Sequence, residues 1–362
     1  MPSRAETLAR AALLRAGFEA AGAQPVETPI LQPAETLLDL YGEDIRARAY
    51  VTSDALRGEQ MLRPDFTVPV VQMHMADGAE PARYTYAGEV FRRQEHDPER
   101  ASEYAQVGFE VFDRTDPAAA DAEVFARIAD ALAGLQLRAA TGDIGVLMAA
   151  VRGLDTSERR RAALMRHIWR PHRFRALLDR FAHRVPVPPA RAAMLACADP
   201  LAGCAPQIGK RSRAEVAARI AALRADAAEP PISAIELTAL EALLGVRETA
   251  PFALRHLRDI AADLPQIGPA LDRLEARIAA LAARGIDVDH LDFEASYGRS
   301  SMEYYDGFVF GFYAERRPDL PAIASGGRYD ALTRRLGQGA EIPAVGGVLR
   351  PGLILELEGA AR

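Results

Sequence analysis

The sequence has few cysteines, no long apolar run and no excess of positive charge. Its 362 residues contain two cysteines, Cys197 and Cys204, and no cysteine or histidine cluster near them has the spacing of a zinc site. We therefore expect the two cysteines to be buried and reduced, as in a cytoplasmic protein. We expect no bound metal and no other cofactor.

Membranes and nucleic acids are not expected as partners. No segment approaches the ~20 apolar residues of a membrane helix, and the N-terminal stretch MPSRAETLARAALLRAGF mixes charged and apolar residues, unlike a signal peptide. The formal net charge is -6, so the chain lacks the overall positive charge of a nucleic-acid-binding protein. The pattern favours a soluble, cytoplasmic protein.

The order of the patterns predicts an α+β protein with a helical insertion. Residues 3–22 read as a helix capped by Ser3, with Leu8, Ala12 and Leu13 on one face. Strands and turns are expected from Met61 to about Asp113, including LRPDFTVPVV. Residues 154–256 are rich in Ala, Arg and Leu with a helical period, and they are expected to interrupt a core formed by 1–153 and 257–362. A helix near 264–284 precedes further strands, which favours an antiparallel sheet flanked by helices.

The strand periods indicate a ligand pocket. In QVGFEVF, Gln106, Gly108 and Glu110 share one face, and the apolar residues between them share the other. In YYDGFVFGFY, Tyr305 shares a face with two glycines, and Tyr304 is expected on the opposite face. SGGRYDAL again places glycines beside polar residues, which leaves room for a ligand. Any one of these strands could be ordinary sheet packing, but three together favour a pocket.

The polar residues near these strands suit a free amino acid. They comprise Asp65, Thr67, Arg92, Gln106, Glu110, Tyr305 and Tyr329. An ammonium group needs an acidic partner, and a carboxylate needs charged donors. An imidazole side chain would also need an acceptor at one nitrogen and a phenol or acid near the other. The residue chemistry permits this ligand without singling it out.

Several motifs, in order, resemble the catalytic core of histidyl-tRNA synthetases, which are class II synthetases. VETP is similar to the dimer-forming first motif, YAGEVFRR…YAQVGFEVF to the second, and MEYYDGFVF and SGGRYDAL to two histidine-specific signatures. The resemblance implies that Asp65, Thr67 and Gln106 face the amino acid's polar end. It places Arg92 at the carboxylate or phosphate side. Glu110 and Tyr305 would face the imidazole, with Tyr304 and Tyr329 in the same site.

The sequence departs from the synthetase pattern where ATP chemistry is done. Gln94 replaces the glutamate of the second motif, and Leu353 replaces the arginine that ends the third. The first histidine signature normally begins with a catalytic arginine. Ser300 stands there, so that arginine is either lost or displaced to Arg299. Loss of one preorganised donor can cost about 10²–10³ in rate. No catalytic activity is therefore expected of the chain alone.

This combination is similar to the regulatory subunits of ATP phosphoribosyltransferase. The resemblance implies a role in the first step of histidine biosynthesis and its feedback inhibition by histidine. The implied partner is a short-form catalytic subunit, in a hetero-oligomer built on homodimers of this chain, without tRNA. Two alternatives stay open: a truncated enzyme that activates histidine, and a stand-alone histidine sensor.

Overall fold

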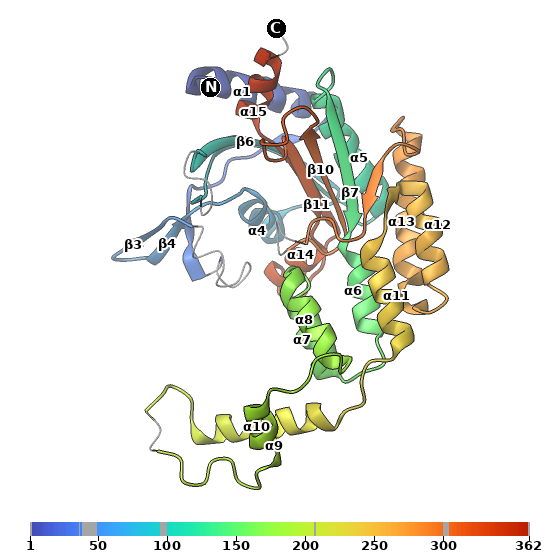
Figure 1. The fold of residues 1–362 in the computed structure, drawn as a ribbon. Helices are drawn as coiled ribbons and strands as arrows, with labels where there is room; N and C mark the ends of the chain where they lie inside the picture. The colour runs from blue at the N-terminus through green and yellow to red at the C-terminus, as the bar shows by residue number, and fades with distance from the viewer. Residues whose placement is uncertain are drawn as a thin grey trace.

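The computed structural model describes residues 2–35, 37, 49–94, 100–205, 208–299 and 304–360 (Figure 1). Its strands are β1 (Gln24–Pro25), β2 (Leu31–Pro33), β3 (Val51–Asp54), β4 (Gly58–Leu62), β5 (Ala82–Phe91), β6 (Glu103–Phe112), β7 (Leu137–Asp143), β8 (Arg247–Thr249), β9 (Asp292–Glu294), β10 (Phe308–Ala314), β11 (Ala324–Arg328) and β12 (Ala344–Leu349). Its helices are α1 (Arg4–Ala20), α4 (Thr67–Asp77), α5 (Pro117–Ala131), α6 (Ile144–Gly153), α7 (Glu158–Arg166), α8 (Pro171–Phe181), α9 (Pro189–Ala196), α10 (Arg213–Ala228), α11 (Ala234–Gly245), α12 (Ala250–Ile260), the short η1 (Pro265–Ile267), α13 (Gly268–Ala283), α14 (Asp330–Leu336) and α15 (Pro351–Ala360).

A large sheet forms the centre of the molecule. Its strands run in the order β1-β5-β6-β12-β11-β10-β7-β9-β8, and a smaller sheet has the order β2-β4-β3. Neighbours in the large sheet are antiparallel, except for the pairs β1–β5 and β7–β9. The expected α+β architecture with a mainly antiparallel sheet is confirmed. Figure 1 shows the β3–β4 hairpin projecting from the body and the two termini lying near each other beside α1 and α15.

The central strands pack their apolar face against helices. Val107, Phe109 and Val111 of β6 lie in one buried cluster with residues of α1, α5 and α15. Phe308 and Phe310 of β10 pack on the ring of Phe125 in the same cluster. The predicted alternation along β6 is therefore confirmed. The opposite face of the sheet carries Gly108, Glu110 and Gly346, and Thr67 of α4 donates a hydrogen bond to Glu110 there.

Helix α1 confirms its predicted cap but not its predicted face. The Ser3 hydroxyl accepts a hydrogen bond from the backbone N–H of Glu6, and the Glu6 carboxylate accepts one from the Ser3 N–H. The buried residues are Ala11, Leu14 and Phe18. The expected face of Leu8, Ala12 and Leu13 is wrong, since these three side chains are exposed. Alanines and leucines of the helix occur on most of its sides, so the period of its apolar residues does not identify the buried side.

The stretch after Leu62 was predicted as strand and turn, but part of it is a helix. Residues Thr67–Asp77 form α4 in spite of their valines and Pro69. Pro69 lies in the first turn, where the backbone N–H has no partner within the helix, so the proline costs little. Val68, Val70 and Val71 are fully buried. Burial therefore outweighs the strand preference of valine.

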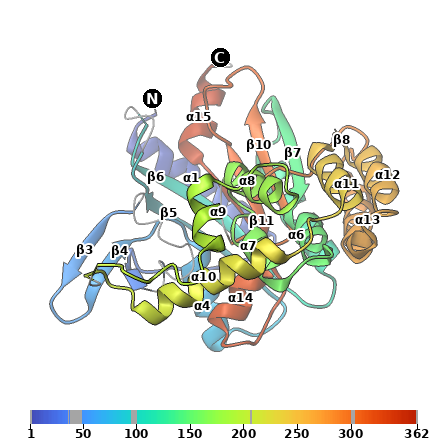
Figure 2. The same ribbon diagram turned by 60° about the horizontal axis from the view of Figure 1, so that its bottom comes forward.

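Residues 154–256 are mostly helical. The helices α9 and α10 lie apart from the large sheet in Figure 1, and in Figure 2, where the bottom of the molecule is turned forward, they pass in front of the body. The small strand β8 pairs with β9 at the edge of the large sheet. The expectation of buried cysteines is wrong: Cys197 and Cys204 are both free and exposed. They lie between α9 and α10, where no sheet is near enough to cover them. No helix in the described residues is long and apolar enough to cross a membrane.

Candidate functional site

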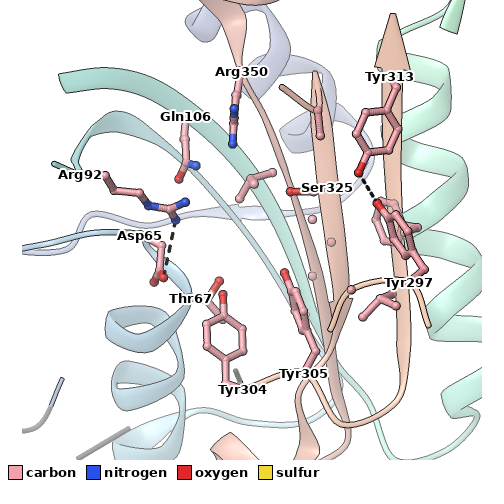
Figure 3. Close-up of a pocket in the computed structure, with 18 residues that line it drawn as sticks. Asp65, Thr67, Arg92, Gln106, Tyr297, Tyr304, Tyr305, Tyr313, Ser325 and Arg350 are labelled. Carbon is pink, nitrogen blue, oxygen red and sulfur yellow. Dashed lines mark hydrogen bonds and ion pairs between the residues drawn. The ribbon is translucent and has the colours of Figure 1, made fainter. Parts of the chain in front are cut away.

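A cavity of about 240 Å³ opens on the polar face of the sheet. Its lining residues come from the start of α4, the end of β5, the strands β6, β10, β11 and β12, and the loops before β10 (Figure 3). This volume lies below the roughly 300–1,000 Å³ of pockets that hold drug-sized ligands. The cavity therefore suits a small molecule such as a single amino acid.

Glycines make room for this cavity and for the groups behind it. A Cβ atom on Gly108 would lie 2.0 Å from the ring of Tyr86, and one on Gly346 would lie 1.4 Å from a carboxylate oxygen of Glu110. A Cβ on Gly326 would lie 2.3 Å from a backbone oxygen of β12. The backbones of β11 and β12 therefore approach closely at Gly326, where no side chain would fit.

The structure brings most of the predicted site residues together. Asp65, Thr67, Arg92, Gln106, Tyr304 and Tyr305 line the cavity. Glu110 and Tyr329 do not line it, and they lie directly behind Thr67. Tyr304 and Tyr305 were expected on opposite faces of a strand, which is wrong. Strand β10 begins only at Phe308, so both tyrosines lie in the preceding turn and both reach the cavity.

Glu110 is the centre of a buried hydroxyl cluster. Its carboxylate accepts hydrogen bonds from Tyr329 Oη at 2.6 Å, Tyr86 Oη at 2.7 Å and Thr67 Oγ1 at 3.1 Å. The residue is 0% exposed, and burial raises the pKa of its carboxyl group to about 7 in spite of these three donors. Glu110 thus holds Thr67 in place at the cavity wall. Its two oxygens offer about four acceptor sites, of which three are used.

The polar end of the cavity is formed by Asp65, Arg92 and Gln106. Arg92 Nε donates to the carbonyl oxygen of Pro64 at 2.7 Å, and its Nη2 lies 4.0 Å from Asp65 Oδ2. Gln106 is 1% exposed, and its side-chain oxygen has no hydrogen-bond donor within the described residues. A buried acceptor without a donor costs about 1–3 kcal/mol, so this oxygen is suited to a donor on a ligand.

Asp306 fixes the turn that carries the two cavity tyrosines. Its carboxylate accepts the backbone N–H of Asp330 at 3.0 Å and of Ala331 at 2.7 Å. Its own N–H donates to the carbonyl oxygen of Arg328 at 3.0 Å. Burial and the nearby Asp330 raise the pKa of the Asp306 carboxyl group to about 7. The tyrosines are thereby held against the strand β11 and the helix α14.

Four further polar residues line the cavity that the sequence patterns did not identify: Tyr297, Tyr313, Ser325 and Arg350. The hydroxyls of Tyr297 and Tyr313 are 2.8 Å apart and hydrogen-bonded. Ser325 and Arg350 could have been found from the alternation of side chains along their strands. Ser325 lies two residues from Gly327, and Arg350 lies four residues from Gly346, so each pair shares a face. Tyr297 precedes β10 in an irregular segment, where no period applies.

Three residues at the departures from the synthetase motifs are described, namely Gln94, Arg299 and Leu353, and none of them lines the cavity. The Arg299 side chain is buried elsewhere: its Nε donates to the carbonyl oxygen of Ile168 at 2.8 Å, and its guanidinium lies over the ring of Phe174. Burial lowers the pKa of Arg299 to about 10. The Gln94 amide donates to the carbonyl oxygen of Ala101 at 3.0 Å. Leu353 packs against the core under the sheet. Ser300 and the next three residues lie outside the described part of the chain.

No cluster of His, Cys, Asp and Glu suited to a metal occurs in the described residues.

Known proteins resemble this chain in sequence and in fold. The family described as "Histidyl-tRNA synthetase" matches residues 1–352. Two solved structures show the fold: an "ATP phosphoribosyltransferase regulatory subunit/histidyl-tRNA synthetase" from Bacillus halodurans (TM-score 0.68, 21% identity, 99% of this chain and 80% of that one) and a histidine–tRNA ligase subunit from Alicyclobacillus acidocaldarius (TM-score 0.61, 23% identity, 100% and 95%).

Two relatives with known names are similar to this chain in sequence over nearly its whole length. ATP phosphoribosyltransferase regulatory subunits of Brucella ovis and Brucella abortus are each 34% identical over 357 residues, covering 92% of this chain and 93% and 92% of theirs. The chain therefore has a class II synthetase-like fold and belongs to the family of ATP phosphoribosyltransferase regulatory subunits.

Proposed function

We propose that this chain is the non-catalytic regulatory subunit of an ATP phosphoribosyltransferase and carries the histidine site for its feedback inhibition. It would act in the first step of histidine biosynthesis, in the cytoplasm, without a cofactor. Its partner would be a short-form catalytic subunit, in a hetero-oligomer built on homodimers of this chain. The names of its relatives support the regulatory role.

The proposal rests mainly on one observation: the amino-acid-binding groups of the synthetase-like site are present, and the groups that would act on ATP are not. The groups that would hold an amino acid are gathered around one small cavity, and no described residue donates a hydrogen bond to the buried Gln106 oxygen. The groups that a synthetase would direct at ATP are replaced or turned away, as Leu353 and Arg299 illustrate. Transfer chemistry depends on preorganised charge at the reacting phosphate. This combination favours binding without catalysis.

Histidine fits the arrangement of groups. Asp65, Thr67 and Gln106 supply acceptors at one end of the cavity for an ammonium group. Tyr305 also lines the cavity, and its phenol can serve one nitrogen of the imidazole. Glu110 lies behind the cavity wall, where its carboxylate holds the Thr67 hydroxyl in place. Tyr304 and Tyr329 close the same region, since their rings are 6.2 Å apart and nearly perpendicular.

Two assays on purified protein test the proposal. The chain alone should give neither histidine-dependent exchange of pyrophosphate into ATP nor phosphoribosyl transfer. Added to a short-form catalytic subunit, it should raise phosphoribosyl transfer, and histidine should lower that activity. Pyrophosphate exchange by the isolated chain, above a heat-inactivated control, would instead identify a truncated histidine-activating enzyme. Histidine binding without any effect on the transferase would identify a stand-alone sensor.

A further inference from the structure

Arg350 reaches the cavity at the end of β12. In the antiparallel pair of β6 and β12, Leu349 lies opposite Val107 and Val348 opposite Gly108. One step along, Arg350 therefore comes beside Gln106, on the face that also carries Gly346 and Val348 (Figure 3). Pro351 follows at the first position of α15, where its fixed φ angle suits a helix start. The position of Arg350 is thus set by two regular elements.

The charge of Arg350 has no counter-ion in the described residues. Its guanidinium makes no hydrogen bond or ion pair there, and it lies 5.4 Å from the centre of the Tyr104 ring. Burial lowers the pKa of Arg350, and the nearby Arg92 and Arg100 lower it further. Arg92 differs, because it faces Asp65. A partly buried cation among other cations is stabilised by an anion.

The same cavity also has hydrogen-bond acceptors that suit a cationic group of the ligand. Within the part of the chain that the structure describes, the side-chain oxygen of Gln106 lacks a donor, and the Asp65 carboxylate is 3% exposed. Acceptors for a cationic group and a free guanidinium thus line one small volume. A zwitterion satisfies both, with its ammonium on the acceptors and its carboxylate on the guanidinium.

We propose that Arg350 binds the carboxylate of the amino acid in this cavity and makes that carboxylate a requirement for binding. The proposal rests on the proposed function, because it assumes histidine as the ligand. Arg350 takes the role that Arg299 cannot take, since Arg299 is bound to the carbonyl of Ile168. The ligand class is therefore a free amino acid, and amines without the carboxylate are excluded.

Calorimetric titration of the full chain with L-histidine and with histamine tests this proposal, since histamine keeps the imidazole and the amine and lacks only the carboxylate. Wild type should bind histamine about 10- to 100-fold more weakly than histidine, because a hydrogen bond to a charged group is lost. Arg350→Gln should weaken histidine by a similar factor and leave histamine nearly unchanged. Arg350→Lys should recover part of the preference, which a merely structural role would not require.

Arg100→Gln is the matched control, because Arg100 is an exposed arginine whose Nη2 donates to the carbonyl oxygen of Asp319. It should keep the wild-type preference for histidine. Equal binding of histidine and histamine by wild type would overturn the proposal, as would an unchanged preference in Arg350→Gln. The proposal would also be overturned if Arg350→Gln abolished binding of ATP and left the binding of histidine unchanged. Failure of wild type to bind either imidazole compound would refute the proposed function itself, and this inference with it.

Discussion

The buried Glu110 carboxyl group should lower the stability of the fold as the pH rises from about 5 to 8. Its folded-state pKa is raised to about 7 by burial, from an ordinary value of 4.5. Between these two values the native state holds a proton that the unfolded state has lost, so unfolding becomes easier with increasing pH. The difference between these two pKa values corresponds to about 3 kcal/mol in total, most of which falls between pH 5 and 8.

The Glu110→Gln variant isolates this contribution. Urea unfolding of wild type and variant at pH 5, 6, 7 and 8 gives the difference in their free energies of unfolding at each pH. Wild type should lose about 2–3 kcal/mol relative to the variant across this range. The Asp306 carboxyl group, whose pKa is also raised to about 7, titrates in both proteins and cancels from the difference. A difference that does not change with pH would refute the assignment of a raised pKa to Glu110.

Other substitutions test the site and its surroundings. Gly108→Ala should destabilise the fold in thermal melts, because its Cβ would lie 2.0 Å from the Tyr86 ring, whereas Gly17→Ala in α1 meets no atom within 4 Å and should stabilise by about 0.5–1 kcal/mol. Arg299→Ala should lower the free energy of unfolding by about 1–3 kcal/mol without reducing histidine affinity; a large loss of affinity would place Arg299 in the site. Tyr305→Phe should weaken histidine binding about 3- to 10-fold in calorimetry if its hydroxyl contacts the ligand, and unchanged affinity would exclude that contact. The 39.2 kDa chain should sediment as a dimer or larger at micromolar concentration, and a monomer would contradict the similarity of VETP to a dimer motif.

Local patterns of the sequence predicted those features that depend on neighbours along one strand or one turn. The faces of β6 follow from a period of two, and the Ser3 cap follows from the Glu6 three residues later. The glycines beside polar residues correctly indicated a cavity, because a missing side chain leaves space whatever packs above it. The residues Asp65 and Gln106 could be placed in that cavity by their resemblance to a known motif set.

Features that depend on contacts between distant segments could not be predicted in this way. The helix α4 forms although its valines favour a strand, because the sheet buries them. Arg350 and Gln106 become neighbours only through the pairing of β12 with β6. Glu110 was expected to face a ligand, and only the fold shows that Thr67, Tyr86 and Tyr329 occupy most of its acceptor sites. Each of these contacts joins segments that are distant in the sequence, so it can be predicted only when the pairing of the strands is known.

An inhibition curve shows whether the cavity is the regulatory histidine site. Phosphoribosyl transfer by the reconstituted complex should be measured against histidine concentration with wild type and with Gln106→Ala, which removes a buried polar group of the cavity. We predict that Gln106→Ala shifts the half-inhibiting concentration of histidine upward by about 10-fold or more, while Arg100→Gln leaves it unchanged. Identical curves for wild type and Gln106→Ala would contradict the account and place the regulatory site elsewhere.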